Sequence, residues 1–207
     1  MVRGAGTREA WIRASADYYV ALHPDEAKWR LTGVAERIPP VDEIRDRAAI
    51  ADRANKAIPR AGRIDPDPER HDEWSARLGW FDETWQTVFT DGFFAAAAAL
   101  KAGDRSGLEH GIRFLEADPW CFRSGYWKAR LIPKIVQLEL DESMRQRLRL
   151  VVLAVVDDPR RRREIGRYGT LARAVATADL RAQLEQRAIA ADPQVRFNAH
   201  QVLVRLG

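Results

Sequence analysis

The dipeptide Asp-Pro recurs three times in the second half of this 207-residue chain, at positions 118, 158 and 192. The spacings are 40 and 34 residues, and each copy ends one stretch of helical hydrophobic periodicity and opens the next. Aspartate can cap the free N–H groups of a new helix, and proline has its φ angle already set for the first helical position. Because recurrence at a nearly fixed period is typical of stacked helix pairs, the pattern predicts an all-α chain.

The rest of the chain also has helical periodicity, and the alternation typical of strands is hard to find. A break is expected near Asp91-Gly92, Gly103 is expected to stop a helix, and Pro133 is expected to kink or split one. Helices are predicted over residues 11–22, 25–37, 41–58, 72–78, 82–102, 108–117, 124–140, 142–156, 161–176, 180–190 and 193–206.

Proline and glycine are concentrated in residues 59–69, which include the run Asp65-Pro66-Asp67-Pro68. This run cannot continue a helix, so we predict a loop or linker there. It would separate an N-terminal helical segment at residues 1–58 from a helical-repeat region at residues 70–207. The alternative is one continuous domain.

Residues 192–199, with the sequence DPQVRFNA, resemble the HEAT-repeat pattern in which an Asp, a Val-Arg pair and a small residue open the second helix. The first two copies match less well, because Arg123 and Arg163 lie five residues after their aspartates and Arg196 lies four after its own. The resemblance covers residues 104–207 and implies an α-α superhelix of HEAT-like antiparallel helix pairs, with the N-terminal helices capping or extending it. The alternative is an irregular multi-helix bundle.

Composition excludes several classes of protein. The hydrophobic share of 46% is too high for a disordered chain, and one cysteine, Cys121, excludes an intrachain disulfide or a cysteine-rich zinc cage. The longest apolar run, residues 93–100, is shorter than the roughly 18 residues that span a membrane, and the N-terminal residues lack the apolar block of a secretory signal. We therefore expect a cytoplasmic protein without a membrane partner.

The net charge of +4 is unevenly distributed along the chain. Residues 1–103 hold 15 Lys/Arg and 17 Asp/Glu, whereas residues 104–207 hold 19 and 13. The excess positive charge therefore lies in the half that carries the Asp-Pro repeats, which indicates an anionic partner.

No catalytic signature is found: a phosphate-binding glycine loop, a dinucleotide fingerprint, a His-Glu-x-x-His pair and a nucleophile-elbow serine are all missing from the sequence. The densest His/carboxylate cluster, His71 to Glu73, is interpreted as a solvated helix N-terminus, because consecutive helical residues point in different directions. Cys121 follows Trp120 and precedes Phe122, so we expect a buried structural thiol with a raised pKa. We predict no catalytic residue, no cofactor and no metal ligand, and lean against an enzyme.

The first candidate binding segment, residues 120–130, holds four aromatic and three cationic side chains between a turn and a helix start. Aromatic and arginine side chains suit stacking and cation–π contacts with peptides or unstacked bases. The alternative is that most of the aromatics are core and that Arg123 pairs with an acid such as Asp118. The partner-binding candidates are Trp120, Arg123, Tyr126, Trp127 and Arg130.

The second candidate segment is a run of arginines at a predicted helix N-terminus, where the helix macrodipole favours negative charge. This unfavourable placement suggests contact with an external phosphate or acidic protein. The alternative is a solvated turn neutralised by Glu164 and the preceding aspartates. The anion-contact candidates are Arg160, Arg161, Arg162, Arg163 and Arg167.

HEAT-like repeats mostly serve as concave binding surfaces, so the resemblance implies recognition rather than catalysis. The function predicted first is a non-catalytic helical-repeat module, a scaffold or adaptor, that binds a protein or peptide. The alternative is a nucleic-acid-associated HEAT-like protein that uses the basic C-terminal half. Some DNA-repair glycosylases are built from HEAT-like repeats, but none of that family's functional residues can be placed on this sequence. The oligomeric state stays open.

Overall fold

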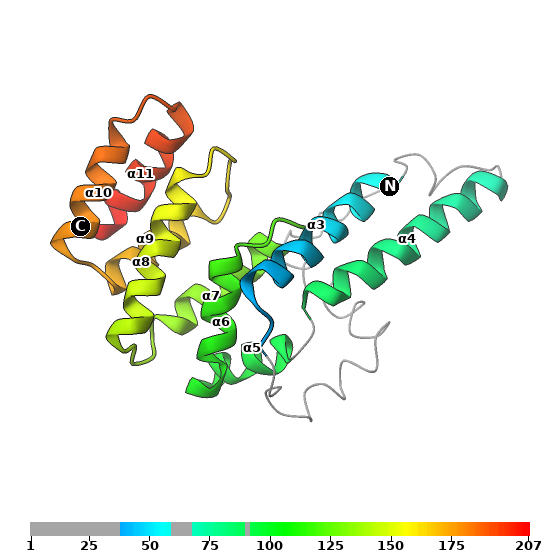
Figure 1. Cartoon of the computed structure of the whole chain (residues 1–207), viewed down its shortest axis with the longest axis horizontal. Helices are drawn as coiled ribbons and strands as arrows, with labels where there is room; N and C mark the ends of the chain where they lie inside the picture. Colours follow the sequence, from blue (N-terminus) through cyan, green and yellow to red (C-terminus); the bar gives the residue numbers. More distant parts are fainter. Residues whose placement is uncertain (1–37, 59–67, 90–91) are drawn as a thin grey trace, which may run out of the picture.

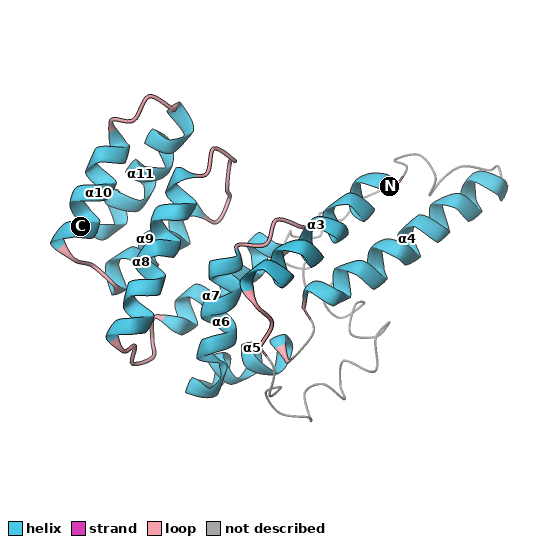
Figure 2. Ribbon diagram, in the orientation of Figure 1, coloured by secondary structure: helices cyan, strands magenta, loops and turns pink. Residues whose placement is uncertain are grey.

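The computed structural model describes residues 38–58, 68–89 and 92–207. This part of the chain consists of helices joined by loops and turns, without strands (Figures 1 and 2). The predicted all-α class is therefore confirmed. The predicted helices at 11–22 and 25–37, most of the predicted linker and Asp91 lie outside the described residues. The helices are α3 (Val41–Ala57), α4 (Pro68–Val88), α5 (Phe93–Ala102), α6 (Leu108–Ala117), α7 (Ser124–Ile135), α8 (Glu142–Asp157), α9 (Ile165–Ala174), α10 (Ala178–Ala188) and α11 (Pro193–Leu206), with a short 3-10 turn at Arg105–Gly107.

The helices contact one another in two rows. In one row α3 contacts α6, α6 contacts α8, and α8 contacts α10; in the other α5 contacts α7, α7 contacts α9, and α9 contacts α11. Each of the pairs α6–α7, α8–α9 and α10–α11 also packs together across the rows. The α3–α4 pair extends from one end of the elongated molecule, and α10 and α11 form the other end (Figure 1).

The sequence predicts two helices at 72–78 and 82–102, but in the structure the break between the two helices lies after Val88 and not near Gly79. Helix α4 runs without interruption through Gly79 to Val88, and α5 begins only after Gly92, which has a left-handed φ of 81°. A glycine inside a helix costs about 1 kcal/mol. Here that cost is offset by burial of Phe81, Trp85 and Phe89, which recur every four residues, the spacing typical of one helical face. The predicted stop is confirmed at Gly103, which is also left-handed and whose N–H bonds to the carbonyls of the last turn of α5.

Two predicted boundaries near the repeat junctions are wrong. Helix α7 ends at Ile135, two residues after Pro133, instead of continuing to residue 140. Helix α9 begins at Ile165 instead of residue 161, because the chain before it is a loop that turns Arg162 inward. By contrast, Asp192 caps α11 as predicted: its carboxylate accepts from the N–H groups of Gln194 and Val195, with Pro193 in the first turn.

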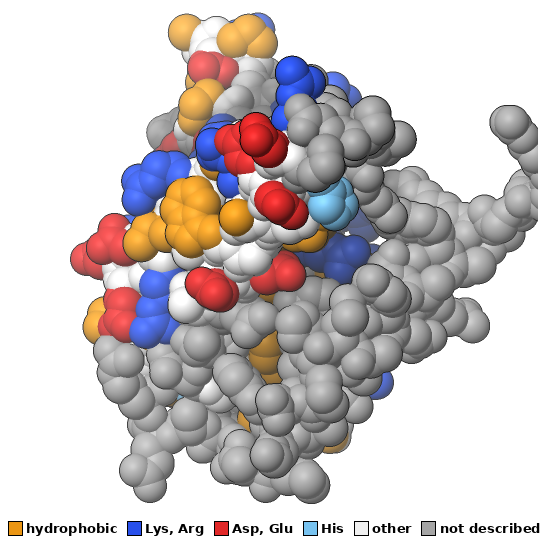
Figure 3. Space-filling model, turned by 90° about the vertical axis from the view of Figure 1, so that its right-hand side faces the viewer, with side chains coloured by type: hydrophobic (Ala, Val, Ile, Leu, Met, Phe, Trp, Pro, Cys, Tyr) orange, Lys and Arg blue, Asp and Glu red, His pale blue; other side chains and the backbone are white. Residues whose placement is uncertain are grey.

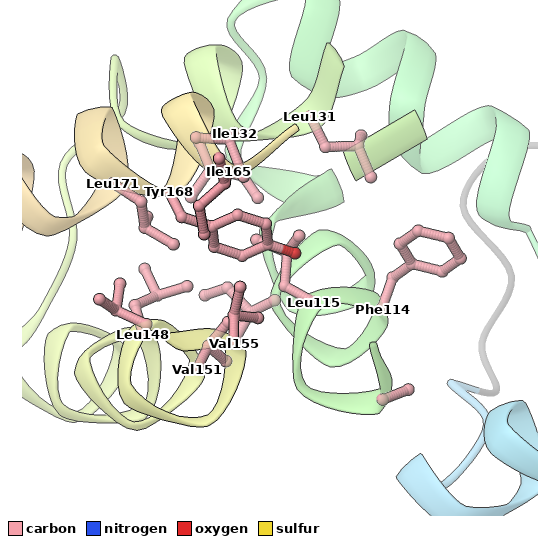
Figure 4. Packing of buried hydrophobic residues seen from close by; sticks show 14 of the residues in the cluster. Phe114, Leu115, Leu131, Ile132, Leu148, Val151, Val155, Ile165, Tyr168 and Leu171 are labelled. Carbon is pink, nitrogen blue, oxygen red and sulfur yellow. The ribbon is translucent and has the colours of Figure 1, made fainter. Parts of the chain in front are cut away.

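The core runs continuously between the rows. Tyr168 of α9 is fully buried, and its ring lies among Leu115 of α6, Ile132 of α7 and Val155 of α8 (Figure 4). In the second half of α8 most side chains are buried, but Leu150 and Ala154 are exposed. None of the described helices combines the length and the hydropathy that a membrane span requires.

Candidate binding surface

The loop between α6 and α7 is held in an unusual backbone conformation. Asp118 has a φ of 45° and Arg123 a φ of 63°, and no other non-glycine residue in the described ranges has a positive φ. Such conformations cost on the order of 1 kcal/mol or more each, and they persist only where the surroundings hold them. Between these two residues the loop presents Trp120 and Phe122, which are 38% and 46% exposed. The loop thus places two partly exposed aromatic side chains between α6 and α7.

A set of buried charges holds this loop. We call Asp118, Lys128, Asp158, Arg162 and Glu164 the buried charge cluster. Lys128 Nζ donates to Asp118 Oδ1 at 2.6 Å and to the carbonyl of Pro119 at 2.7 Å. Arg162 donates to both carboxylate oxygens of Asp118, at 2.8 and 2.5 Å, and also bonds Asp158. The side chains of Lys128 and Arg162 are completely buried, so water does not compete for these bonds.

Burial and pairing shift the pKa values within the cluster. Burial opposes ionisation of Asp158, but hydrogen bonds from Arg160 and Arg162 outweigh it and hold the pKa of that carboxyl well below its usual range. Burial also lowers the pKa of Lys128, while the charge of Asp118 opposes that shift. The nearby hydroxyl of Tyr168 has no hydrogen-bond partner among the described residues, and burial raises its pKa well above the usual value. The carboxylate of Asp158 therefore stays charged and bound to Arg160 and Arg162 at neutral pH.

The arginine run is divided between the interior and the surface. Arg162 is buried, and Arg160 bonds Asp158 while its guanidinium lies 4.5 Å from the centre of the Trp120 ring. Arg161, Arg163 and Arg167 are exposed, and no ion pair is formed by any of the three within the described part of the chain. We call these three the free arginines. Neutralisation by a preceding aspartate thus holds for Arg160 and Arg162 only.

The candidates at residues 120–130 lie together at the start of α7. Arg123 lies 5.2 Å from the centre of the Phe122 ring, and Arg130 lies 5.3 Å from the centres of both the Tyr126 and Trp127 rings. Neither arginine forms an ion pair with any residue in the described ranges. Asp118, the acid expected to pair with Arg123, is bound by Lys128 and Arg162 instead. We call Trp120, Phe122, Arg123, Tyr126 and Arg130 the aromatic–arginine surface.

Trp127 is the exception among these aromatics, because it belongs to the core as well. Its ring lies 5.5 Å from Phe93 and 5.5 Å from Phe94 of α5, and the side chain is half-buried. Tyr126, its neighbour in the chain, is 45% exposed. Trp127 therefore anchors the start of α7. The other three aromatic side chains are partly exposed, and the Phe122 ring also packs edge-on against Phe81, with 5.7 Å between the ring centres.

The segment before α9 contacts the start of α7. A Cβ atom at Gly125 would lie 2.8 Å from Glu164 Oε2, so the first turn of α7 is in close contact with the residue that precedes α9. Glu164 directly follows Arg163 in the chain, and Arg167 lies in the first turn of α9.

A groove of about 620 Å³ lies on the other side of the same loop. Its walls come from α3 and α8, and its floor comes from the end of α6 and the loop that follows. Alanines on both walls, Ala48, Ala49 and Ala154, leave the space open, and Trp120 and Arg160 also line it. Trp120 therefore belongs to both the groove and the aromatic–arginine surface.

Other candidates from the sequence have structural surroundings. His71 stacks on Trp74 at 6.0 Å, and no cluster of three metal-ligating side chains is found in the described ranges. The face at the α3–α4 end mixes acidic, basic and hydrophobic side chains (Figure 3). Burial raises the pKa of Cys121 to about 12, as its apolar neighbours predict.

Sequence reasoning missed the buried charge cluster, although one signal for it was present. Lys128 occupies the same helical stripe as Leu131, Ile132 and Ile135, all buried. A lysine in an apolar stripe requires a buried acid as its partner. The groove between α3 and α8 had no such signal, because its walls lie about 100 residues apart in the sequence.

No protein-family model, no curated protein and no solved structure matches this chain.

Proposed function

We propose that this protein is a non-catalytic helical-repeat module that binds an acidic segment of a protein or peptide partner. The observation that carries the proposal is the pair Arg123 and Arg130, each stacked on an exposed aromatic ring and neither paired with an acid in the described part of the chain. Trp120 connects this surface to the groove, whose lining includes five carboxylates and two arginines, so the groove would receive a part of the partner that is not acidic.

Polar contacts between successive helix pairs support a HEAT-like stack over an irregular bundle. Arg162, at the α8–α9 junction, reaches back to Asp118 at the α6–α7 junction. Asn198 of α11 reaches back in the same way and donates to the carbonyls of Val156 and Asp158, at 3.3 and 3.1 Å. Contacts from one helix pair back to the junction of the preceding pair, together with the two rows of helices, are typical of repeats that contact only their neighbours.

The chemistry of the surface favours carboxylates. A guanidinium that lies on an aromatic ring can still present N–H groups to a carboxylate in a two-point contact. Arg130 uses one of its terminal nitrogens to donate to the Tyr126 hydroxyl at 3.3 Å, which leaves its other N–H groups for a partner. The exposed rings of Phe122 and Tyr126 add contact area with little loss of conformational entropy. Because the buried charge cluster fixes the loop before binding, little ordering has to accompany recognition.

Selection from a displayed library of random peptides tests this proposal. Peptides enriched on the wild-type protein should be rich in Asp and Glu, and R123A/R130A should weaken their binding at least about tenfold, the loss expected from about 1.4 kcal/mol. The double variant R53A/R173A removes two exposed arginines that form no ion pair in the described ranges, and it should bind like the wild type. Peptides without acidic enrichment, or equal losses in the two double variants, would refute the proposal.

A second candidate function, binding to single-stranded nucleic acid, is favoured by the free arginines. The free arginines are exposed, as are the rings of Trp120, Phe122 and Tyr126. Exposed cations together with aromatic stacking platforms are typical of proteins that bind single strands. Binding of a fluorescent oligonucleotide should then weaken as the salt concentration rises. A plot of the logarithm of the binding constant against the logarithm of the salt concentration should have a slope of about −0.7 for each phosphate contact.

The variant R161S/R163S/R167S should reduce that slope by about 2, while R53S/K101S/R173S, which also removes three exposed cations, should leave it unchanged. Arg160 and Arg162 are left in place because they hold the fold. If the oligonucleotide does not bind at low salt, this second candidate is wrong and the acidic-peptide proposal is unaffected.

A further inference from the structure

The groove between α3 and α8 arises from a difference in helix length. Helix α6 lies between these two helices and contacts both of them (Figure 1). It has 10 residues, whereas α3 has 17 and α8 has 16. Because each helical residue adds about 1.5 Å of length, α3 and α8 are each about 10 Å longer than α6. The groove lies where α6 ends, with Leu115, Glu116 and Ala117 from its last turn in the floor.

The charged side chains in the lining of the groove all have partners within the protein. Arg45 donates to the carbonyls of Glu116 and Ala117, at 3.0 and 3.1 Å, and Arg160 pairs with Asp158. Each lining carboxylate is bound to a lysine or an arginine; these acids are Asp52, Glu116, Asp118, Asp157 and Asp158. A charged side chain that entered the groove would lose its hydration without gaining an unpaired partner, which costs free energy.

The uncharged part of the lining is apolar and leaves room for a side chain. Exposed apolar surface comes from Ala49 of α3, Ala154 of α8, Trp120 and Pro159. Leu150, one helical turn before Ala154, is 57% exposed and extends this surface along α8. The volume of about 620 Å³ falls in the range of about 300–1,000 Å³ typical of ligand pockets, which are mostly apolar. An apolar side chain would fill this space without breaking an ion pair.

We infer that the groove takes a large apolar side chain of the same partner segment whose acidic residues bind the aromatic–arginine surface. This inference rests on the proposed function, because it gives that segment a second contact. Trp120 lines the groove, and Arg123 follows three residues later, so their Cα atoms lie at most about 11 Å apart. A few extended residues span that distance. The recognised motif is therefore a large apolar residue within about five positions of an acidic one.

Peptides selected from the displayed random library test this inference at the level of sequence. One position within about five of the acidic residues should be confined to Leu, Ile, Met, Phe or Trp. Its replacement by alanine should weaken binding at least about tenfold, as expected for a large apolar side chain that is buried. A position confined to Lys or Arg, or acidic peptides without an apolar preference, would overturn the inference and leave the proposed function standing.

The variant A154W tests where this side chain binds, because tryptophan would fill the groove from the wall of α8. It should weaken binding of the selected peptide at least about tenfold, and it should not weaken the peptide with the alanine replacement further. The variant A49W, on the opposite wall, should act in the same way. The matched control is A182W, which changes an exposed alanine on α10, away from the groove, and should bind like the wild type.

All three tryptophan variants should keep the circular dichroism spectrum and melting temperature of the wild type, because the three alanines are exposed. If R123A/R130A weakens binding of the peptide and the two groove variants do not, the inference is wrong and the proposed function stands. The reverse result, a loss in the groove variants alone, refutes the acidic contact and keeps the apolar one.

Discussion

Replacing Arg162 by methionine should destabilise the protein far more than any other substitution in the arginine run. Arg162 is the one member of the run whose side chain is completely buried, and it binds two carboxylates whose side chains are only 19% and 11% exposed. The variant R162M removes a positive charge that neutralises the carboxylates of Asp118 and Asp158 in a region of low dielectric constant. Removing one partner of a buried ion pair costs about 3–5 kcal/mol.

Two features of the structure place the expected loss near the lower end of that range. Lys128 still binds Asp118, and Arg160 still binds Asp158. Both carboxylates also keep some contact with solvent. We therefore expect a loss of about 3 kcal/mol in the free energy of unfolding, a large share of the roughly 5–15 kcal/mol typical of a folded domain.

Urea unfolding, followed by circular dichroism and tryptophan fluorescence, measures this loss. The neighbouring variant R161M is the control, because Arg161 is exposed, and its change should stay within about 0.5 kcal/mol. The double variant D118N/R162M should lose less stability than the sum of its two single variants, since the stranded charge is removed. A loss for R162M below about 1 kcal/mol, or equal to that of R161M, would refute the burial argument.

The loss should also depend on pH. The pKa of Asp158 is lowered in the folded protein, so its ionisation stabilises the fold above the unfolded value of about 4, and this contribution is lost as the pH falls below that value. Protonation removes the uncompensated charge in R162M. The difference in stability between R162M and the wild type should therefore be smaller near pH 3 than at pH 7.

Three further predictions concern single side chains. Because burial raises the pKa of Cys121 to about 12, iodoacetamide at pH 8 should label the folded protein at least about 100-fold more slowly than the urea-unfolded chain, and equal rates would contradict the burial of this thiol. The variant D192A should lose about 1 kcal/mol through its missing helix cap, while D192N should keep most of that stability; equal urea midpoints for D192A and the wild type would count against the cap. The variant Y168F removes a buried hydroxyl that has no partner in the described ranges, so its melting temperature should equal or exceed that of the wild type, and a clear decrease would show that the hydroxyl is bound.

Helix positions were predictable from the sequence because their periodicity is local. The stripe of Phe81, Trp85 and Phe89 is buried as its spacing predicts, and Asp192 caps its helix as expected. The separation predicted near Gly79 was wrong, because packing of the aromatic stripe outweighs the cost of one glycine.

The interior of the candidate site was not predictable in the same way. The carboxylate of Asp118 binds Arg162, 44 positions away, and not the N–H groups that follow it. Sequence reasoning treated four consecutive arginines as one charged unit at a helix end. The backbone before α9 is not helical, so adjacent arginines point in opposite directions and only some of them reach solvent.

The buried charge cluster also restricts how this protein can evolve. Replacing Asp118 alone leaves two buried cations without their shared partner. Replacing Lys128 or Arg162 alone leaves the carboxylate of Asp118 with one cationic partner fewer. Each single step passes through a poorly folded intermediate, whereas a joint replacement by apolar residues can be neutral. Related sequences should therefore keep these charges as a set or lose them as a set, and the loop that carries Trp120 should change its conformation with them.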